Sequence, residues 1–309
     1  MPRFRNILLV ADQHAVPDAL ARAIKLAADR ETRLTLLDVV RPMARVPLRG
    51  ISSTELQALM VKERRDALER LAASLTVAGP PPKVLVRVGM SFIEIIRTVL
   101  AEGHDLLLKS PEGPDGGSLL FGSTDLHLLR KCPCPVWLAK QTRGQTPKRI
   151  LAAVDLEPGD EDATATTLHS RILELAAALA AQAGGELQVV YAWALLGEEL
   201  LRSGRVDVDL DKALSQTRDF YAGRLTDLLA NCSLGGIGIR RHLLKGEPQT
   251  VVPELAREEA IGLIVMGTVA RTGIAGFLIG NTAERLLARV DCSVLALKPP
   301  GFHTPVEPH

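Results

Sequence analysis

Short aliphatic runs alternate along the chain with longer segments in which apolar residues recur every three or four positions. Runs of this kind predict buried strands of a parallel sheet, and the longer segments predict amphipathic helices that cover it. The alternation therefore predicts α/β domains, each a doubly wound, five-stranded parallel sheet flanked by helices. The expected strands are 6–11, 33–40, 83–88, 105–109 and 135–139 in the first half, and 150–155, 187–192, 240–245, 263–266 and 294–297 in the second.

The segments between these strands carry helix signals. Pro17 favours the start of a helix over about 17–30, because a missing backbone N–H costs nothing in the first turn. Ser52 and Glu55 have the spacing of a capping box, and so do Ser91 and Glu94, so we expect a helix to begin after each serine. Further helices are predicted over 173–183, 211–230 and 251–259.

The second half of the chain repeats the first. Four pairs of matching positions keep their order at offsets of 143, 157, 158 and 158 residues: Asp12 and Asp155, Gly89 and Gly246, Gly122 and Gly280, and Cys134 and Cys292. The offset grows mainly once, which indicates one insertion in the second copy. It falls mainly in 195–210, where we expect an irregular surface loop. We predict two domains, 1–143 and 144–309, joined by a short polar linker at about 140–148.

Composition narrows the class of protein. The chain has 37 basic and 36 acidic residues, so its net charge of +1 gives no general attraction for nucleic acid or an anionic membrane. The apolar run at 7–10 is too short for a signal peptide, and no segment approaches the roughly 18 apolar residues of a membrane span. The 4 cysteines do not indicate a disulfide framework in 309 residues. We expect a cytoplasmic protein that binds neither nucleic acid nor membrane.

Candidate ligand residues lie where strands end, because a doubly wound sheet binds ligands beyond the carboxyl ends of its strands. Asp12 and Asp155 each end the first strand of their copy. A carboxylate there can accept a hydrogen bond from a ribose hydroxyl, although aspartate also caps loops without any ligand. A glycine-bearing loop runs from Gly267 to Gly280, where a helix is expected to begin. Free N–H groups at such a helix N-terminus suit phosphate.

This loop resembles the nucleotide loop of the universal stress protein family, which reads Gly, two residues, Gly, nine residues, Gly, then Ser or Thr. Gly267 and Gly280 match the first and third glycines. Ala270 stands at the second glycine, and Asn281, followed by Thr282, stands at the Ser or Thr. The runs 125–133 and 280–284 are similar in particular to the tandem E-type members of bacteria. The resemblance covers nearly the whole chain in two passes.

The resemblance implies a stress-response regulator that binds an adenine nucleotide, ATP or AMP, in its second copy. It also implies that the two domains pair within the chain as a pseudo-dimer, through 135–139 and 294–297, and it allows a homodimer of whole chains. The methyl group of Ala270 would cost roughly 1 kcal/mol if the loop requires a positive φ there. The expected ligand-binding residues are Asp155, Ala192, Gly267, Thr268, Ala270, Gly280, Asn281 and Thr282.

The first copy departs further from the family pattern. Glu112 and Asp115 would repel phosphate, although Lys109 could offset one of them, so we expect its nucleotide site to be lost. The weaker candidate ligand residues of this copy are Asp12, Val39, Lys109, Gly122 and Ser123.

No catalytic motif stands out in the sequence. It contains no nucleophile elbow, acid–base pair, metal motif or intact P-loop, so we expect no enzyme, no catalytic residue and no metal site, with slow ATP hydrolysis left open. Cys132 and Cys134 are expected to be buried small apolar residues, and Trp137 and Trp193 to be packing residues. Two rival functions remain open: a binder of a non-nucleotide, partly apolar metabolite, and a ligand-free interaction scaffold.

Overall fold

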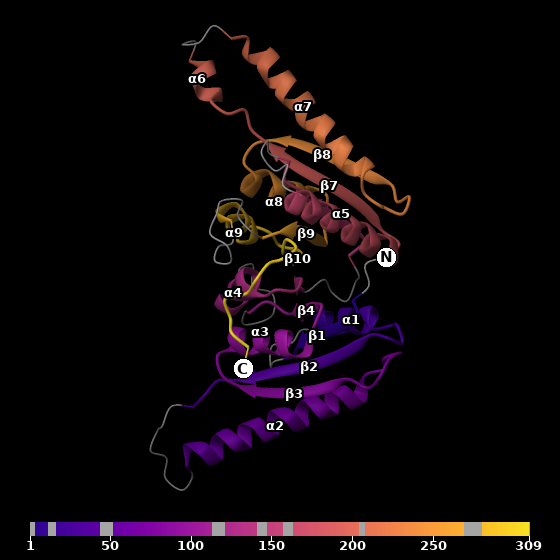
Figure 1. Ribbon diagram of the computed structural model, residues 1–309, viewed down its shortest axis with the longest axis vertical. Helices are drawn as coiled ribbons and strands as arrows, with labels where there is room; N and C mark the ends of the chain where they lie inside the picture. Colours follow the sequence, from indigo (N-terminus) through magenta and orange to yellow (C-terminus); the bar gives the residue numbers. More distant parts are fainter. Residues whose placement is uncertain are drawn as a thin grey trace. The chain divides into compact units, whose positions relative to one another are not determined.

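The described part of the computed structural model comprises residues 4–11, 17–43, 52–112, 121–140, 147–156, 163–203, 208–268 and 280–308. Figure 1 shows the alternating strands and helices. The chain divides into two compact units. We call them the N-terminal unit, which holds 3–146, 268–280 and 293–309, and the C-terminal unit, which holds 147–267 and 281–292. The duplication predicted from the sequence is thus visible as two units, each with its own set of parallel strands and covering helices.

The N-terminal unit is built on the strand order β3-β2-β1-β4-β5, in which all neighbouring pairs are parallel. This confirms the predicted five-stranded parallel sheet of the first copy. β10, from the end of the chain, pairs with β5 in the antiparallel direction. The strands are β1 (Asn6–Val10), β2 (Arg33–Val40), β3 (Lys83–Val88), β4 (Leu106–Lys109), β5 (Val136–Leu138) and β10 (Ser293–Leu297), and the helices are α1 (Pro17–Leu26), α2 (Ser53–Ser74), α3 (Ser91–Glu102) and α4 (Ser123–Lys131).

The C-terminal unit repeats this plan with the parallel strand order β9-β6-β7-β8. Among its helices, α5 packs on β6, β7 and β9, and α7 packs on β7 and β8. The strands are β6 (Arg149–Ala153), β7 (Glu186–Trp193), β8 (Ile239–Lys245) and β9 (Leu263–Gly267), and the helices are α5 (Ala163–Ala183), α6 (Glu198–Arg202), α7 (Leu210–Ala230), α8 (Pro248–Glu258) and α9 (Asn281–Leu287).

Aliphatic side chains form the core of both units, as the composition requires. The central strands β1 and β4 of the N-terminal unit are almost entirely buried, which explains their unbroken apolar sequence. Trp137 and Trp193 are each 4% exposed, so both are packing residues as predicted. Among the described residues, no helix is long and apolar enough to cross a membrane.

One of the two predicted capping boxes is present. Ser52 accepts a hydrogen bond from the backbone of Glu55, whose side chain in turn accepts one from the backbone of Ser52. The prediction for Ser91 and Glu94 was wrong, because the cap of α3 is Met90 and Ser91 is already in the helix. Glu94 instead forms an ion pair with Arg97 at 2.9 Å, one turn further along.

The insertion of the second copy contains a short helix, α6, where we expected only an irregular loop. Glu198 fixes this helix by pairing with Lys245 at the end of β8 and with Arg202, each at 2.7 Å. These two cations lower the pKa of Glu198. Leu196, just before the helix, is 97% exposed.

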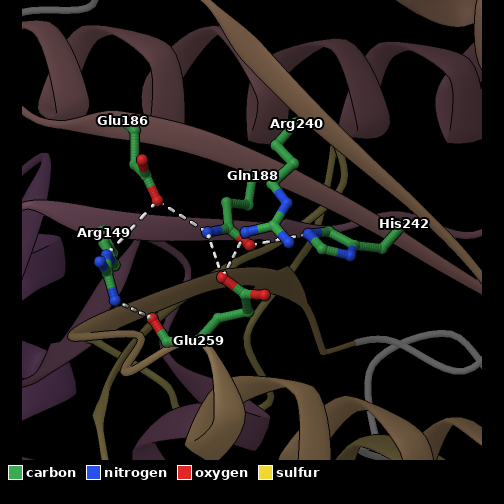
Figure 2. Close-up of polar contacts among 6 residues, drawn as sticks. All are labelled: Arg149, Glu186, Gln188, Arg240, His242 and Glu259. Carbon is green, nitrogen blue, oxygen red and sulfur yellow. Dashed lines mark hydrogen bonds and ion pairs between the residues drawn. The ribbon is translucent and has the colours of Figure 1, made fainter.

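A polar network joins the amino ends of the strands in the C-terminal unit (Figure 2). Fully buried Gln188 on β7 donates to Glu186 at 2.8 Å and to Glu259 at 3.3 Å, so its oxygen accepts from His242 Nε2 at 2.7 Å. Burial and the nearby Arg240 lower the pKa of His242. Arg149 and Arg240 bind Glu259 from β6 and β8. The network therefore ties three strands to the end of α8, at the edge opposite the expected ligand site.

Candidate functional site

The expected ligand edge of the second copy is formed by the carboxyl ends of β6, β7 and β9. Ala153, at the end of β6, is in register with Val190 on β7 and Met266 on β9. The strand order reverses at β6, so this is the topological switch point at which doubly wound sheets bind ligands. Asp155 follows β6 and is partly exposed at this edge.

Other predicted ligand residues of the second copy lie on the elements that meet this edge. Ala192 is a partly exposed residue near the end of β7, and Gly267 is the last residue of β9. Asn281 is the first residue of α9, and Thr282 beside it is exposed. Ala270 lies outside the described residues.

Gly267 has a packing role that the sequence did not reveal. A Cβ atom at this position would lie 3.1 Å from Leu168 Cδ2 on α5, and contacts this short require the neighbour to move. Close approach of the Leu168 side chain to the end of β9 therefore disfavours any side chain at position 267. The glycine alone is not a sign of a ligand.

The side chain of Thr268 is occupied by the protein. It is 1% exposed, and its hydroxyl donates to the carbonyl of Leu129 at 3.2 Å. The same hydroxyl and the same carbonyl accept hydrogen bonds from Lys298 Nζ, just beyond β10. The backbone carbonyl of Thr268 accepts from Gly280 N at 3.3 Å, which closes the base of the loop. The hydroxyl of Thr268 is therefore not presented to solvent.

Burial gives Lys298 an unusual titration. Its side chain lies beneath the end of β10, and loss of hydration lowers its pKa from 10.5 to about 7. A neutral amine has two N–H groups, and Lys298 has two acceptors in Thr268 and Leu129. Sequence inspection missed this lysine, although it stands 158 residues after Lys140, at the offset of the repeat.

The equivalent edge of the first copy has the same topology. Val10, at the end of β1, is in register with Leu37 on β2 and with Lys109 on β4. Val39 on β2 is partly exposed, and the predicted Asp12 lies outside the described residues. Gly122 caps α4, and Ser123 is its exposed first residue.

Lys109 is not a solvent-facing cation here but half of a buried ion pair. Its Nζ lies 2.9 Å from Asp125 Oδ1 and 2.8 Å from the carbonyl of Ser110, and it is 2% exposed. Asp125 is fully buried, and its second oxygen accepts from the backbone N–H groups of Gly122 at 2.9 Å and Glu112 at 2.8 Å. The charge on Lys109 is therefore already neutralised, and Asp125 is a residue that sequence inspection did not single out.

Glu112 takes the position expected for an anion at the start of α4. Its Oε2 accepts a hydrogen bond from the backbone N–H of Thr124 at 3.2 Å. A Cβ atom built on Gly122 would lie 2.2 Å from this same oxygen, so the carboxylate lies directly against the backbone of the glycine. A negative group here is favoured by the helix dipole. The sequence predicted that Glu112 would repel phosphate; its side chain in fact fills the place.

The two copies differ at all three of these positions. At the 158-residue offset of Gly122 and Gly280, Lys109 corresponds to Gly267, Asp125 to Ala283 and Glu112 to Ala270. Both members of the ion pair are thus absent together from the second copy. This pattern agrees with the high free-energy cost of leaving either charge buried alone. It is also the signal by which the role of Asp125 could have been found.

The remaining candidate residues, two cysteines and a histidine, are packed against other side chains of the protein. Cys132 and Cys134 are free, with sulfur atoms 3.6 Å apart and exposures of 0% and 7%. His127 stacks on Phe92, with ring centroids 4.2 Å apart. Among the described residues, no group of three His, Cys, Asp or Glu side chains could hold a metal ion.

Comparison with known proteins identifies the family. A profile of the Universal stress protein family matches residues 3–140 and, a second time, residues 146–298. The chain belongs to the universal stress protein family. Its two matches make it a tandem universal stress protein, and they correspond to the two repeats seen in the sequence.

Full-length relatives have the same tandem organisation. The chain is 30% identical over 320 aligned residues to Universal stress protein E of Escherichia coli K12, with 99% of this chain and 98% of the relative covered. It is 27% identical over 316 residues to a Universal stress protein E homolog of Haemophilus influenzae, covering 96% and 98%. These similarities support the predicted E-type organisation.

Solved structures agree with the fold. A protein of unknown function from Pseudomonas aeruginosa PAO1 is 28% identical and superimposes with a TM-score of 0.63, covering 96% of this chain and 93% of the other. A universal stress protein from Archaeoglobus fulgidus gives a TM-score of 0.61 at 17% identity, covering 94% and 98%. The second likeness shows the fold alone.

Proposed function

We propose that this universal stress protein is a cytoplasmic stress-response regulator that binds an adenine nucleotide, ATP or AMP, in its second copy without turning it over. The site consists of Asp155, Ala192 and the loop from Gly267 to Thr282. Asp155 would accept a ribose hydroxyl, and the start of α9 would receive the phosphates.

The choice of the second copy as the nucleotide-binding one rests on one observation. In the first copy, a buried ion pair and the carboxylate of Glu112 occupy the start of α4. The second copy has glycine or alanine at the three corresponding positions, so none of these three residues carries a charge that would compete with a phosphate. Family membership supports the expectation of a regulatory role, and the difference between the copies supports the choice of the second copy.

The first experiment is mass spectrometry of small molecules released from gently purified full-length protein. Co-purified ATP or AMP supports the proposal, whereas an apolar metabolite supports the rival binder and an empty protein supports the scaffold. The exposed Leu196 and Leu200 of the insertion are the residues that an apolar ligand would use. Phosphate release from added ATP tests turnover, and we expect none above a protein-free blank.

Titration of stripped protein with ATP and AMP then tests the placement. Gly280→Leu adds bulk at the start of α9, and we expect at least tenfold weaker binding. Gly223→Leu is the matched control, because nothing lies within 4 Å of a Cβ built on Gly223 in α7. Unchanged affinity in Gly280→Leu contradicts the placement.

A further inference from the structure

We propose that Glu112 is the residue that excludes nucleotide phosphates from the first copy, because its carboxylate is held as an internal ligand at the start of α4. The inference deepens the proposed function by explaining why only one copy would bind. Glu112 itself is not among the residues that would hold the nucleotide, so its role can fail or succeed separately.

The first argument is that the Glu112 carboxylate already occupies the start of α4. A helix N-terminus alone does not define a site, but here an anionic group of the protein is already bound on it. Glu112 Oε2 accepts from Thr124 N at 3.2 Å. The same oxygen would lie only 2.2 Å from a Cβ atom on Gly122, so it fills the space that a phosphate would need to approach this backbone.

The second argument concerns Asp125, which binds the backbone of the segment that carries Glu112. Asp125 Oδ2 binds the backbone N–H groups of Gly122 and of Glu112 itself, which anchors the segment that carries the carboxylate. Asp125 also neutralises Lys109 at 2.9 Å, so this ammonium does not attract a second anion. Glu112 is the outer of the two carboxylates, since Asp125 is fully buried and Glu112 is only half-buried.

The third argument comes from comparing position 112 with its counterpart in the second copy. The counterpart of Glu112 is Ala270, at the position where the family loop has glycine. Alanine has no carboxylate with which to take the place that Glu112 takes in the first copy. Glu112 is the outermost of the three positions at which the copies differ, so a reciprocal exchange at this position is the sharpest test.

The test uses stripped full-length protein and three variants: Glu112→Ala, the reciprocal Ala270→Glu, and Glu69→Ala as a control that removes a carboxylate from the exposed face of α2. The probes are ATP and, separately, inorganic pyrophosphate, with the number of sites measured by calorimetry. We expect one ATP site in the wild type and Glu69→Ala, two in Glu112→Ala, and none in Ala270→Glu.

Hydrogen exchange gives a readout that does not depend on the second copy. Loss of the Glu112 carboxylate frees the Thr124 amide, so its exchange should become at least tenfold faster in Glu112→Ala and slow again with pyrophosphate. Glu112→Gln separates occupancy from charge: its carboxamide oxygen can still accept from Thr124, so Thr124 exchange should stay slow and no pyrophosphate site should be gained, whereas a gained site would show that the charge alone excludes phosphate.

The outcomes separate the two proposals. A folded Glu112→Ala protein that gains no site for ATP or pyrophosphate overturns the role of Glu112, even when the wild type binds one ATP. A wild type that binds nothing, with one site gained in Glu112→Ala, supports the role of Glu112 and overturns the nucleotide site of the second copy. No binding in either protein overturns both.

Discussion

Lys109 Nζ and Asp125 Oδ1 lie 2.9 Å apart, and the two side chains are only 3% and 0% exposed. Removing one partner leaves a charge buried without its counter-ion, which typically costs 3–5 kcal/mol. We therefore expect Asp125→Ala to destabilise the protein by about this amount. Lys109→Gly/Asp125→Ala, which reproduces the residues of the second copy, should cost clearly less than the two single changes together.

Urea unfolding of the wild type, both single variants and the double variant closes this thermodynamic cycle. Part of the cost will persist in the double variant, because Asp125 also accepts two backbone N–H groups. Additivity of the two single effects within about 0.5 kcal/mol would contradict a coupled buried pair.

Gly267 is predicted to be required by helix packing. Its Cβ position lies 3.1 Å from Leu168 Cδ2, so Gly267→Ala should force a small shift of α5 and cost about 1–3 kcal/mol, as overpacking usually does. In the background of Leu168→Ala, the same change should cost much less, and urea unfolding measures both. An equal cost in both backgrounds would place the reason for the glycine elsewhere.

The sequence predicted the architecture well because periodicity and repetition report directly on burial. β2 and β3 were predicted with their exact bounds, since each aliphatic run ends at polar or glycine residues. The start of α3 was not, because Ser91 has a capping-box partner by spacing but lies inside the helix. Local spacing cannot show that Glu94 pairs with Arg97 instead.

The candidate site was predicted only in outline. Strand-end residues such as Asp155 and Gly267 follow from the topology, so the sequence places them on one edge. The buried partners do not follow, because the contact between Lys109 and Asp125 spans 16 residues and depends on how α4 packs against α3 and β5. Thr268 was predicted to be a ligand-binding residue, and its hydroxyl is bonded to Lys298 and Leu129, which no sequence pattern shows.

Lys298 predicts a rise in stability with pH just above neutrality. Its pKa in the folded protein is about 7, lowered by burial, against an ordinary value of 10.5. Above pH 7 the unfolded chain binds a proton at this residue that the folded protein does not, so the free energy of unfolding increases with pH in this window. Urea unfolding at pH 7.0 and 8.5 should show the increase in the wild type, and Lys298→Met should remove it.

The rise of the free energy of unfolding with pH ends where the cysteines begin to titrate, because a buried thiol lowers this free energy as the pH increases. The hydrogen bond with the Cys132 sulfur, together with burial, raises the pKa of the Cys134 thiol, so the unfolded chain loses this proton first and stability falls at higher pH. A wild type and a Lys298→Met variant with the same pH dependence between 7.0 and 8.5 would contradict a neutral Lys298.

Thiol labelling should separate one cysteine from the other three. Cys132, Cys134 and Cys292 are 0%, 7% and 9% exposed, whereas Cys232 at the end of α7 is only half-buried. Because the thiolate is the reactive form, the raised pKa of Cys134 slows its reaction further. In native protein at pH 8, an aromatic disulfide reagent should label Cys232 first, and in urea it should label 4 thiols. Cys232→Ser should remove the early phase; rapid native labelling of Cys132 or Cys134 would instead indicate that α4 opens readily from β5.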